Sequence, residues 1–166
     1  MNLYHKVHPN DLGSVLANGL QRTSRGDLGS DKSIVQTDAY LDQRRPEGLK
    51  SKQVSRDDNI YAFLEVEGKI VDITDGALVP IKRFIAESKQ KVVCLTVDPK
   101  RCFVSDLDTY DALKAAIEQH EKGTPERLTH SYWSKLTPLS EYRFGTFRRP
   151  EVMVTYDVDP TAIRLL

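Results

Sequence analysis

The sequence has few features that would tie it to a disulfide framework or a membrane. Only 2 of its 166 residues are cysteine, too few for the disulfide framework of a small secreted domain. Cys94 and Cys102 lie in or beside apolar runs, so we expect both to be buried, reduced thiols. No apolar run approaches the roughly 20 residues that span a bilayer, and the N-terminus lacks the charged and then apolar layout of a signal peptide. These absences predict a cytoplasmic protein without a membrane partner.

Net charge and common catalytic motifs are also missing. The 24 lysines and arginines balance the 24 aspartates and glutamates, so no overall field favours nucleic acid, although a local basic patch stays open. No glycine-rich phosphate loop or nucleophile elbow is present. His5 and His8 are spaced like a metal pair, but no third ligand follows at a usable spacing, so we predict no metal site.

The segments that are present indicate one α+β domain over residues 1–166. Expected strands are 2–7, 60–64, 92–97, 102–104, 141–147 and 152–158. Expected helices are a short one from Leu12 that stops at Gly19, another short one near 37–44, 80–88 with Pro80 at its first position, and 109–121 between Thr109 and Gly123. We expect polar connections at 21–59 and 124–140, a hairpin or loop at 68–76, and a core or lid role for Trp133. Strands dominate the end of the chain, which favours a mixed or antiparallel sheet.

Three strands carry polar or aromatic residues that core packing does not obviously need. His5 lies in the first strand, Tyr61 in the strand at 60–64, and Glu151 at the start of the last strand. Alternation over residues 151–158 places Glu151 on the face opposite the valine row. Each residue also has a plain structural interpretation: a strand histidine, a packing tyrosine and an ordinary strand-entry carboxylate.

Taken in order, these segments resemble a known family. The segments that carry the resemblance are 3–5, the helix ending in Gly19-Leu20, 59–63, 93–99 and 149–154. Together they resemble the ADP-ribosyltransferase fold, in the branch with a His-Tyr-Glu triad and among its small bacterial members. The resemblance implies a mixed or antiparallel β core of two packed small sheets with short flanking helices, and an enzyme that uses NAD.

The resemblance also assigns roles to residues of this chain. Glu151 would stabilise the oxocarbenium-like transition state, accept a ribose hydroxyl and help orient or deprotonate the acceptor. Tyr61 would line the nicotinamide pocket, His5 would bind a ribose hydroxyl, and the backbone of Lys6 would pair with the carboxamide. Phe84 is the candidate for a second stacking ring.

The resemblance also raises two further questions: which arginines would bind the pyrophosphate, and which molecule would accept the ADP-ribose. Arg22 and Arg25 follow the first helix, where a pyrophosphate could lie, although such arginines are more often part of a solvated loop. The acceptor would be a protein, a nucleic acid or a small molecule. By analogy with small bacterial members, the protein would act as a toxin or defence effector with a cognate antitoxin as partner.

Two alternatives stay open. One is an RNA 2'-phosphotransferase of the same fold, which would have several arginines around the histidine; Arg22 and Arg25 favour it and Glu151 disfavours it. The other is a degenerate module that only binds a nucleotide or a partner. Lys6 favours this second alternative, because many members have glycine there, and so does the lack of a second tyrosine after the Tyr61 strand.

Overall fold

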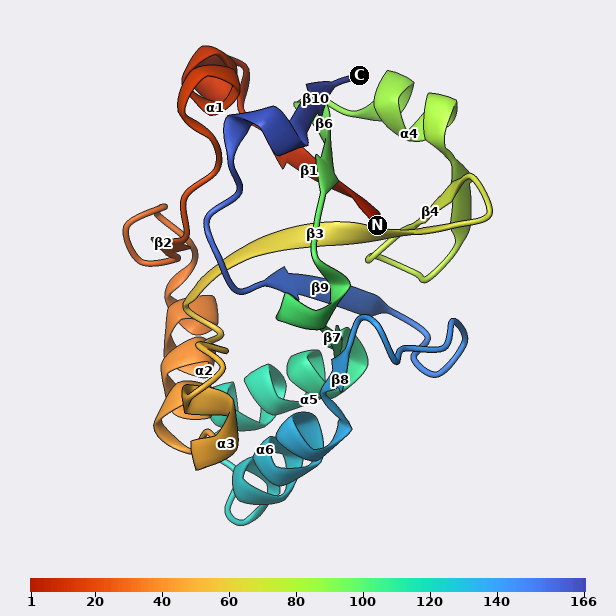
Figure 1. The fold of residues 1–166 in the computed structure, drawn as a ribbon. Coiled ribbons are helices and arrows are strands. Elements are labelled where there is room, and N and C mark those ends of the chain that lie inside the picture. The colour runs from red at the N-terminus through yellow and green to blue at the C-terminus, as the bar shows by residue number, and fades with distance from the viewer.

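A long central strand organises the fold. In the computed structural model, which describes residues 1–166, β3 (Asp58–Val66) pairs through residues 60–62 with β9 (Pro150–Val154) and through residues 63–64 with β1 (Asn2–Val7). Both pairings are antiparallel. β3 therefore belongs to two groups of strands, and it crosses the middle of the molecule between them (Figure 1).

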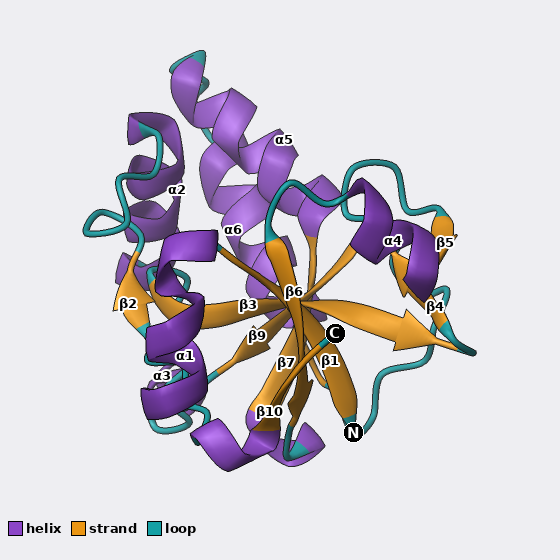
Figure 2. Cartoon of the chain, turned by 90° about the horizontal axis from the view of Figure 1, so that it is seen from above, coloured by secondary structure: helices purple, strands orange, loops and turns teal.

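The full order is β10-β6-β1-β3-β9-β7-β8, with every pairing antiparallel. β6 (Lys91–Thr96) and β10 (Ile163–Leu165) extend the sheet beyond β1, while β7 (Cys102–Asp106) and β8 (Thr137–Pro138) extend it beyond β9. β2 (Thr23–Ser24) pairs with the start of β3, and the β4 (Lys69–Val71) and β5 (Leu78–Pro80) ribbon pairs with its end. Seen from above, the strands of the two halves point in different directions and cross (Figure 2).

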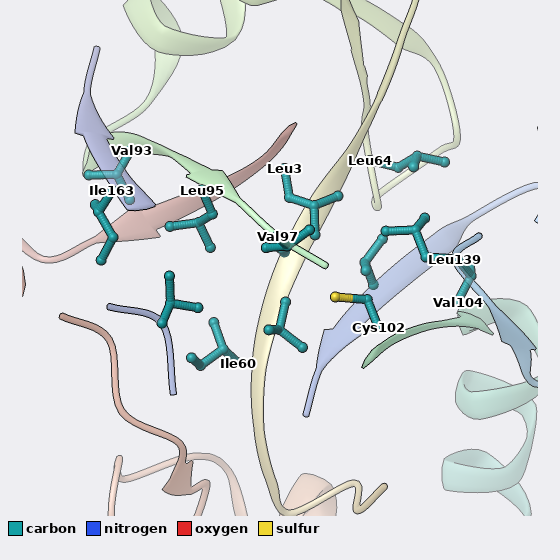
Figure 3. Close-up of a cluster of buried hydrophobic side chains, with 14 of the residues drawn as sticks. Leu3, Ile60, Leu64, Val93, Leu95, Val97, Cys102, Val104, Leu139 and Ile163 are labelled. Atoms are coloured by element: carbon teal, nitrogen blue, oxygen red, sulfur yellow. The ribbon is translucent and has the colours of Figure 1, made fainter. Parts of the chain in front are cut away.

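The main core lies where the two halves face each other. Leu3, Val93 and Leu95 come from the β1–β6 half and are fully buried. Val104 and Val152 come from the β7–β9 half and belong to the same cluster. In Figure 3, Leu3 and Leu95 from one half and Val104 from the other lie between the ribbons of the two halves, so burial of apolar surface holds the halves together.

Helices cover the outer face of the β7–β9 half. α2 (Lys32–Gln43), α5 (Leu107–Glu118) and α6 (Thr124–Lys135) pack there against Phe103 and Met153. Trp133 of α6 is 5% exposed and donates its indole N–H to the Leu41 carbonyl at 3.0 Å. Figure 1 shows these helices gathered at one end of the molecule, beside the short α3 (Glu47–Lys50).

The outer face of the β1–β6 half has a smaller cover. α4 (Ile81–Glu87) and the β4–β5 ribbon pack there around Phe63 and Phe84. α1 (Leu12–Asn18) follows β1 after the 3-10 turn Pro9–Asp11. Two further 3-10 turns, Pro99–Arg101 and Pro160–Ala162, precede β7 and β10. The longest helices have 12 residues, and none has the length and hydrophobicity needed to cross a membrane.

Much of the sequence-based prediction is confirmed. The class is α+β with an antiparallel sheet, and strands form in five of the six expected regions. α1 ends before Gly19, whose φ of 85° suits glycine. Cys94 and Cys102 are free and buried, and Trp133 is part of the core.

Two predicted connections were wrong because each contains a full helix. Residues 21–59 hold the 12-residue α2, longer than the short helix expected near 37–44, and residues 124–140 hold α6. Leu41 is the one buried aliphatic residue of α2, and α6 buries proline, threonine, tyrosine and tryptophan, so the apolar periodicity of both helices is weak. Gly123 does not end α5; it is the N-cap of α6, with a φ of 78°.

Element boundaries near the end of the chain also differ from the prediction. Residues 141–147 form turns instead of a strand, with Gly145 at a φ of 93°. The last long strand, β9, runs from Pro150 to Val154 and is buried on both faces, so the alternation did not mark a solvent face. Asp106 caps α5 where Thr109 was expected, and Pro80 is the N-cap of α4.

Candidate functional site

The largest of the four cavities lies where β1, α1 and the start of β3 meet. It has a volume of about 980 Å³, at the upper end of the range for small-molecule sites. Its walls include His5 and Lys6 from β1, Ser14 and Asn18 from α1, and Tyr61 from β3. We call it the β1–α1 cleft.

His5 lines this cleft as a neutral acceptor. Its partner in β6 is Val93, and it projects from the same face of β1 as Leu3. Its Nδ1 lies 2.6 Å from the Tyr61 carbonyl oxygen, so Nδ1–H donates and Nε2 carries the free lone pair. Burial lowers the pKa of His5, partly offset by this hydrogen bond. The neutral ring can therefore accept a hydrogen bond from a ligand hydroxyl.

The side chain of Lys6 points away from the cleft. Its ammonium nitrogen lies 4.7 Å from the centre of the Phe84 ring and 5.2 Å from that of Phe63. Phe84 packs edge-on against Phe63, with ring centres 4.9 Å apart, and neither ring lines the cleft. The backbone of Lys6 is thus placed to meet a ligand, whereas Phe84 is a packing residue on the other face of β1.

Tyr61 and Glu151 lie together in a buried cluster beside the cleft. Tyr61 is the register partner of Met153, two residues beyond Glu151 on the same face of β9. Glu151 is 7% exposed, and its carboxylate accepts a hydrogen bond from Arg56 at 2.6 Å. Arg25 approaches its other oxygen at 3.8 Å. Glu151 is therefore held by two guanidinium groups.

Arg56 is the centre of this cluster. It is fully buried, its Nε lies 3.3 Å from Asp38, and its Nη1 donates to the Tyr132 hydroxyl at 3.0 Å. Its carbonyl accepts the Tyr61 hydroxyl. Burial opposes the charge of Arg56, but its neighbours, Glu151 and Asp38 among them, outweigh burial and raise its pKa. Each of the buried carboxylates of Asp38 and Glu151 thus has two arginine side chains within 4 Å, and burial raises the pKa of Asp38 although both arginines oppose this.

Arg25 and Arg22 are both paired with acids. The Arg25 guanidinium lies 3.9 Å from the centre of the Tyr61 ring and 3.4 Å from Asp38. Arg22 lies 3.6 Å from Asp157 and 3.8 Å from Asp58. A phosphate group would have to compete with these carboxylates for either arginine.

The three residues of the expected triad sit on adjacent strands but not on one face. Leu3 pairs with Leu64, and both belong to the main core on the inner face of the sheet. His5 comes two residues after Leu3 in β1 and therefore projects from the same inner face. The Tyr61 ring and Glu151 project from the opposite face. The structure brings Tyr61 and Glu151 together and joins His5 to them through the Tyr61 carbonyl; Glu151 itself does not line the cleft.

The sequence-based reasoning missed four residues of this cluster: Asp38, Arg56, Tyr110 and Tyr132. Asp38, Tyr110 and Tyr132 come from α2, α5 and α6, and two of these helices were expected to be polar connections. Arg56 stands in a polar run before β3, where nothing in the sequence marks it as buried. Its one available signal was its position four residues before the apolar start of a strand.

No protein-family model, curated protein or solved structure matches this chain.

Proposed function

We propose that this protein binds NAD in the β1–α1 cleft and in the adjoining space over the Tyr61 ring that Arg25 occupies, and transfers its ADP-ribose to an acceptor, using an ADP-ribosyltransferase-like core over residues 1–166. The observation that carries the proposal is the strand order: β1, β3 and β9 are neighbours. His5, Tyr61 and Glu151 therefore stand on three adjacent strands next to a cleft large enough for a dinucleotide.

The chemistry assigns each residue a task. The bond between nicotinamide nitrogen and ribose C1' breaks with its electron pair leaving on nicotinamide. An acceptor nucleophile then bonds to C1' and loses its proton. Glu151 stabilises the positive charge that develops on the ribose, and neutral His5 accepts a hydrogen bond from a ribose hydroxyl. The Lys6 backbone is free to pair with the carboxamide, and the Tyr61 ring offers a stacking face.

Arg25 must move for this reaction to occur. Its guanidinium covers the Tyr61 ring at 3.9 Å and approaches Glu151 at 3.8 Å, where the nicotinamide riboside would bind. The positively charged nicotinamide of NAD replaces this planar cation, and the released Arg25 is then available to the pyrophosphate. The segment that carries Arg25 contains Gly26 and Gly29, the latter with a φ of 71°, so its backbone has the freedom to reposition the side chain.

The acceptor in this proposal is a protein, a nucleic acid or a small molecule. The proposed setting is the cytoplasm. A toxin or defence role with a cognate antitoxin rests on analogy with small bacterial members alone.

The test is nicotinamide release from NAD by the wild type and by Glu151→Ala. Turnover in the wild type and a loss of about 10²-fold or more in the variant are expected, because one electrostatic stabiliser is removed. Glu141→Ala is the matched control, because Glu141 is exposed and lies outside both cleft and cluster. Equal rates in wild type and Glu151→Ala would remove Glu151 from the mechanism.

A second candidate is a module that binds a nucleotide without transfer. The 2.6 Å contact between Arg56 and Glu151 favours it, because an arginine that neutralises this carboxylate competes with a developing cation. NAD binding without nicotinamide release would support this candidate. For the RNA 2'-phosphotransferase, the pairing of Arg22 and Arg25 with carboxylates is unfavourable. Product analysis with NAD and a 2'-phosphorylated RNA separates it from the other two.

A further inference from the structure

Glu151 makes two contacts with cations, and the two differ in kind. Arg25 reaches it at 3.8 Å from a surface segment, with a partly exposed side chain. Arg56 reaches it at 2.6 Å from a side chain that is fully buried. The shorter contact is a charge-assisted hydrogen bond with a fixed direction, whereas the longer one is an ion pair that solvent and ligands can reach.

From this difference we propose that Arg56 is a positioning residue that fixes the carboxylate of Glu151. Its meaning for catalysis rests on the proposed function. Arg56 acts through Glu151 and touches no ligand. Arg25 is the exchangeable partner, and Arg56 stays in place when Arg25 leaves.

Hydrogen bonds with residues of α2 hold Arg56 in place, and a tyrosine of α5 supports one of these residues. The Asp42 carboxylate accepts hydrogen bonds from the Arg56 backbone N–H at 2.7 Å, the Ser55 hydroxyl at 2.7 Å and the Asp57 N–H at 3.1 Å. At the other end of the side chain, Asp38 accepts from Arg56 Nε at 3.3 Å and from the Tyr110 hydroxyl at 2.9 Å. Both the backbone and the guanidinium of Arg56 are therefore fixed before any ligand binds.

The geometry requires arginine at this position. Nε faces Asp38 while Nη1 faces Glu151 and Tyr132. A planar guanidinium can span these partners, but a lysine ammonium is a single point of charge at the end of a flexible chain. Arg56→Lys keeps the positive charge and loses this span, so it separates charge balance from positioning.

The experiment compares wild type, Arg56→Lys and Arg56→Met with the control Arg44→Met. Arg44 stacks on Tyr40 at 3.6 Å, is exposed and has no contact with Glu151. Nicotinamide release gives kcat, and calorimetric titration gives the Kd for NAD. Circular dichroism establishes that each variant is folded.

For Arg56→Lys we expect kcat to fall by about 10²-fold, because a misplaced catalytic group costs about that much. The Kd for NAD should stay within about threefold of wild type, a split that a general structural defect would not produce. Arg56→Met should lose more activity, and Arg44→Met none. A kcat for Arg56→Lys equal to wild type, or a parallel loss of binding and kcat, would overturn the proposal.

Crystal structures of wild type and Arg56→Lys without ligand test the positioning separately from activity. We expect the Glu151 carboxylate of the variant to turn away from its wild-type place towards Arg25. An unmoved carboxylate overturns the positioning role, whatever the activity. If wild type releases no nicotinamide but the carboxylate moves, the proposed function fails and Arg56 still fixes Glu151.

Discussion

Removal of Arg56 should destabilise the fold by an amount that the buried ion pairs set. Arg56→Met leaves Glu151 and Asp38, which are 7% and 0% exposed, without their shortest cationic contact. Breaking a buried pair from one side costs about 3–5 kcal/mol. Arg25 stays within 3.4 Å of Asp38 and 3.8 Å of Glu151, so we place the loss at the lower end, about 3 kcal/mol.

A second variant separates the charge effect from lost packing. In a Glu151→Gln background one of the two buried carboxylates that lose their arginine partner is already replaced by a neutral amide, so Arg56→Met should cost about 1 kcal/mol. The coupling energy is then about 2 kcal/mol, within the range for directly paired residues. Arg44→Met, which removes an exposed arginine stacked on Tyr40, should change stability by about 0.5 kcal/mol or less.

Urea unfolding measures these differences. Trp133, the only tryptophan, lies in the helical layer beside the cluster and reports by fluorescence, with circular dichroism as a second probe. The melting temperature should fall by about 6–12 °C for Arg56→Met, at 2–4 °C per kcal/mol. A loss no larger than that of Arg44→Met, or the same loss in the Glu151→Gln background, would refute the reasoning.

Two further predictions concern His5 and Gly19. Because burial lowers the pKa of His5 below its ordinary value of 6.5, the unfolded chain binds more protons between these two pKa values. The free energy of unfolding therefore falls as the pH drops below about 6.5, by at most about 1.4 kcal/mol per pH unit. Urea titrations should show a flatter pH dependence for His5→Gln, and an unchanged slope would contradict a buried neutral ring. Gly19→Ala places a Cβ 2.2 Å from the Val158 carbonyl at a φ of 85°, and should cost about 1–3 kcal/mol. Gly13→Ala, with open space around the new methyl group, should be neutral or slightly stabilising by the same measurement, and similar losses in both variants would contradict this explanation.

The sequence predicted best where apolar residues are dense. β3 and β6 hold short apolar runs, residues 60–64 and 92–95, so the sequence pattern indicated strands there. α6 was missed and α2 was predicted too short, because their buried faces are built from residues such as Thr37, Asp38 and Thr129. Those polar side chains pack against other helices, and that tertiary context is not visible in local periodicity.

The sequence named three candidate residues, but it did not give the arrangement in which the structure places them. His5, Tyr61 and Glu151 do stand on neighbouring strands, which the order of motifs indicated. Their faces could not be read, because they depend on which residues of β1 and β9 pair with β3, and a shift by one residue turns every side chain over. The burial of Arg56 could not be predicted for a different reason: its partners Asp38 and Glu151 lie in segments that are distant in the sequence.

The most direct test of the central claim is a crystal structure of the protein with NAD bound. We predict the dinucleotide in the β1–α1 cleft, with a ribose hydroxyl on His5, Arg25 displaced from Tyr61, and Glu151 facing the nicotinamide ribose while still bound to Arg56. NAD bound elsewhere, or NAD in the cleft with Arg25 still covering Tyr61 and Glu151, would contradict the account.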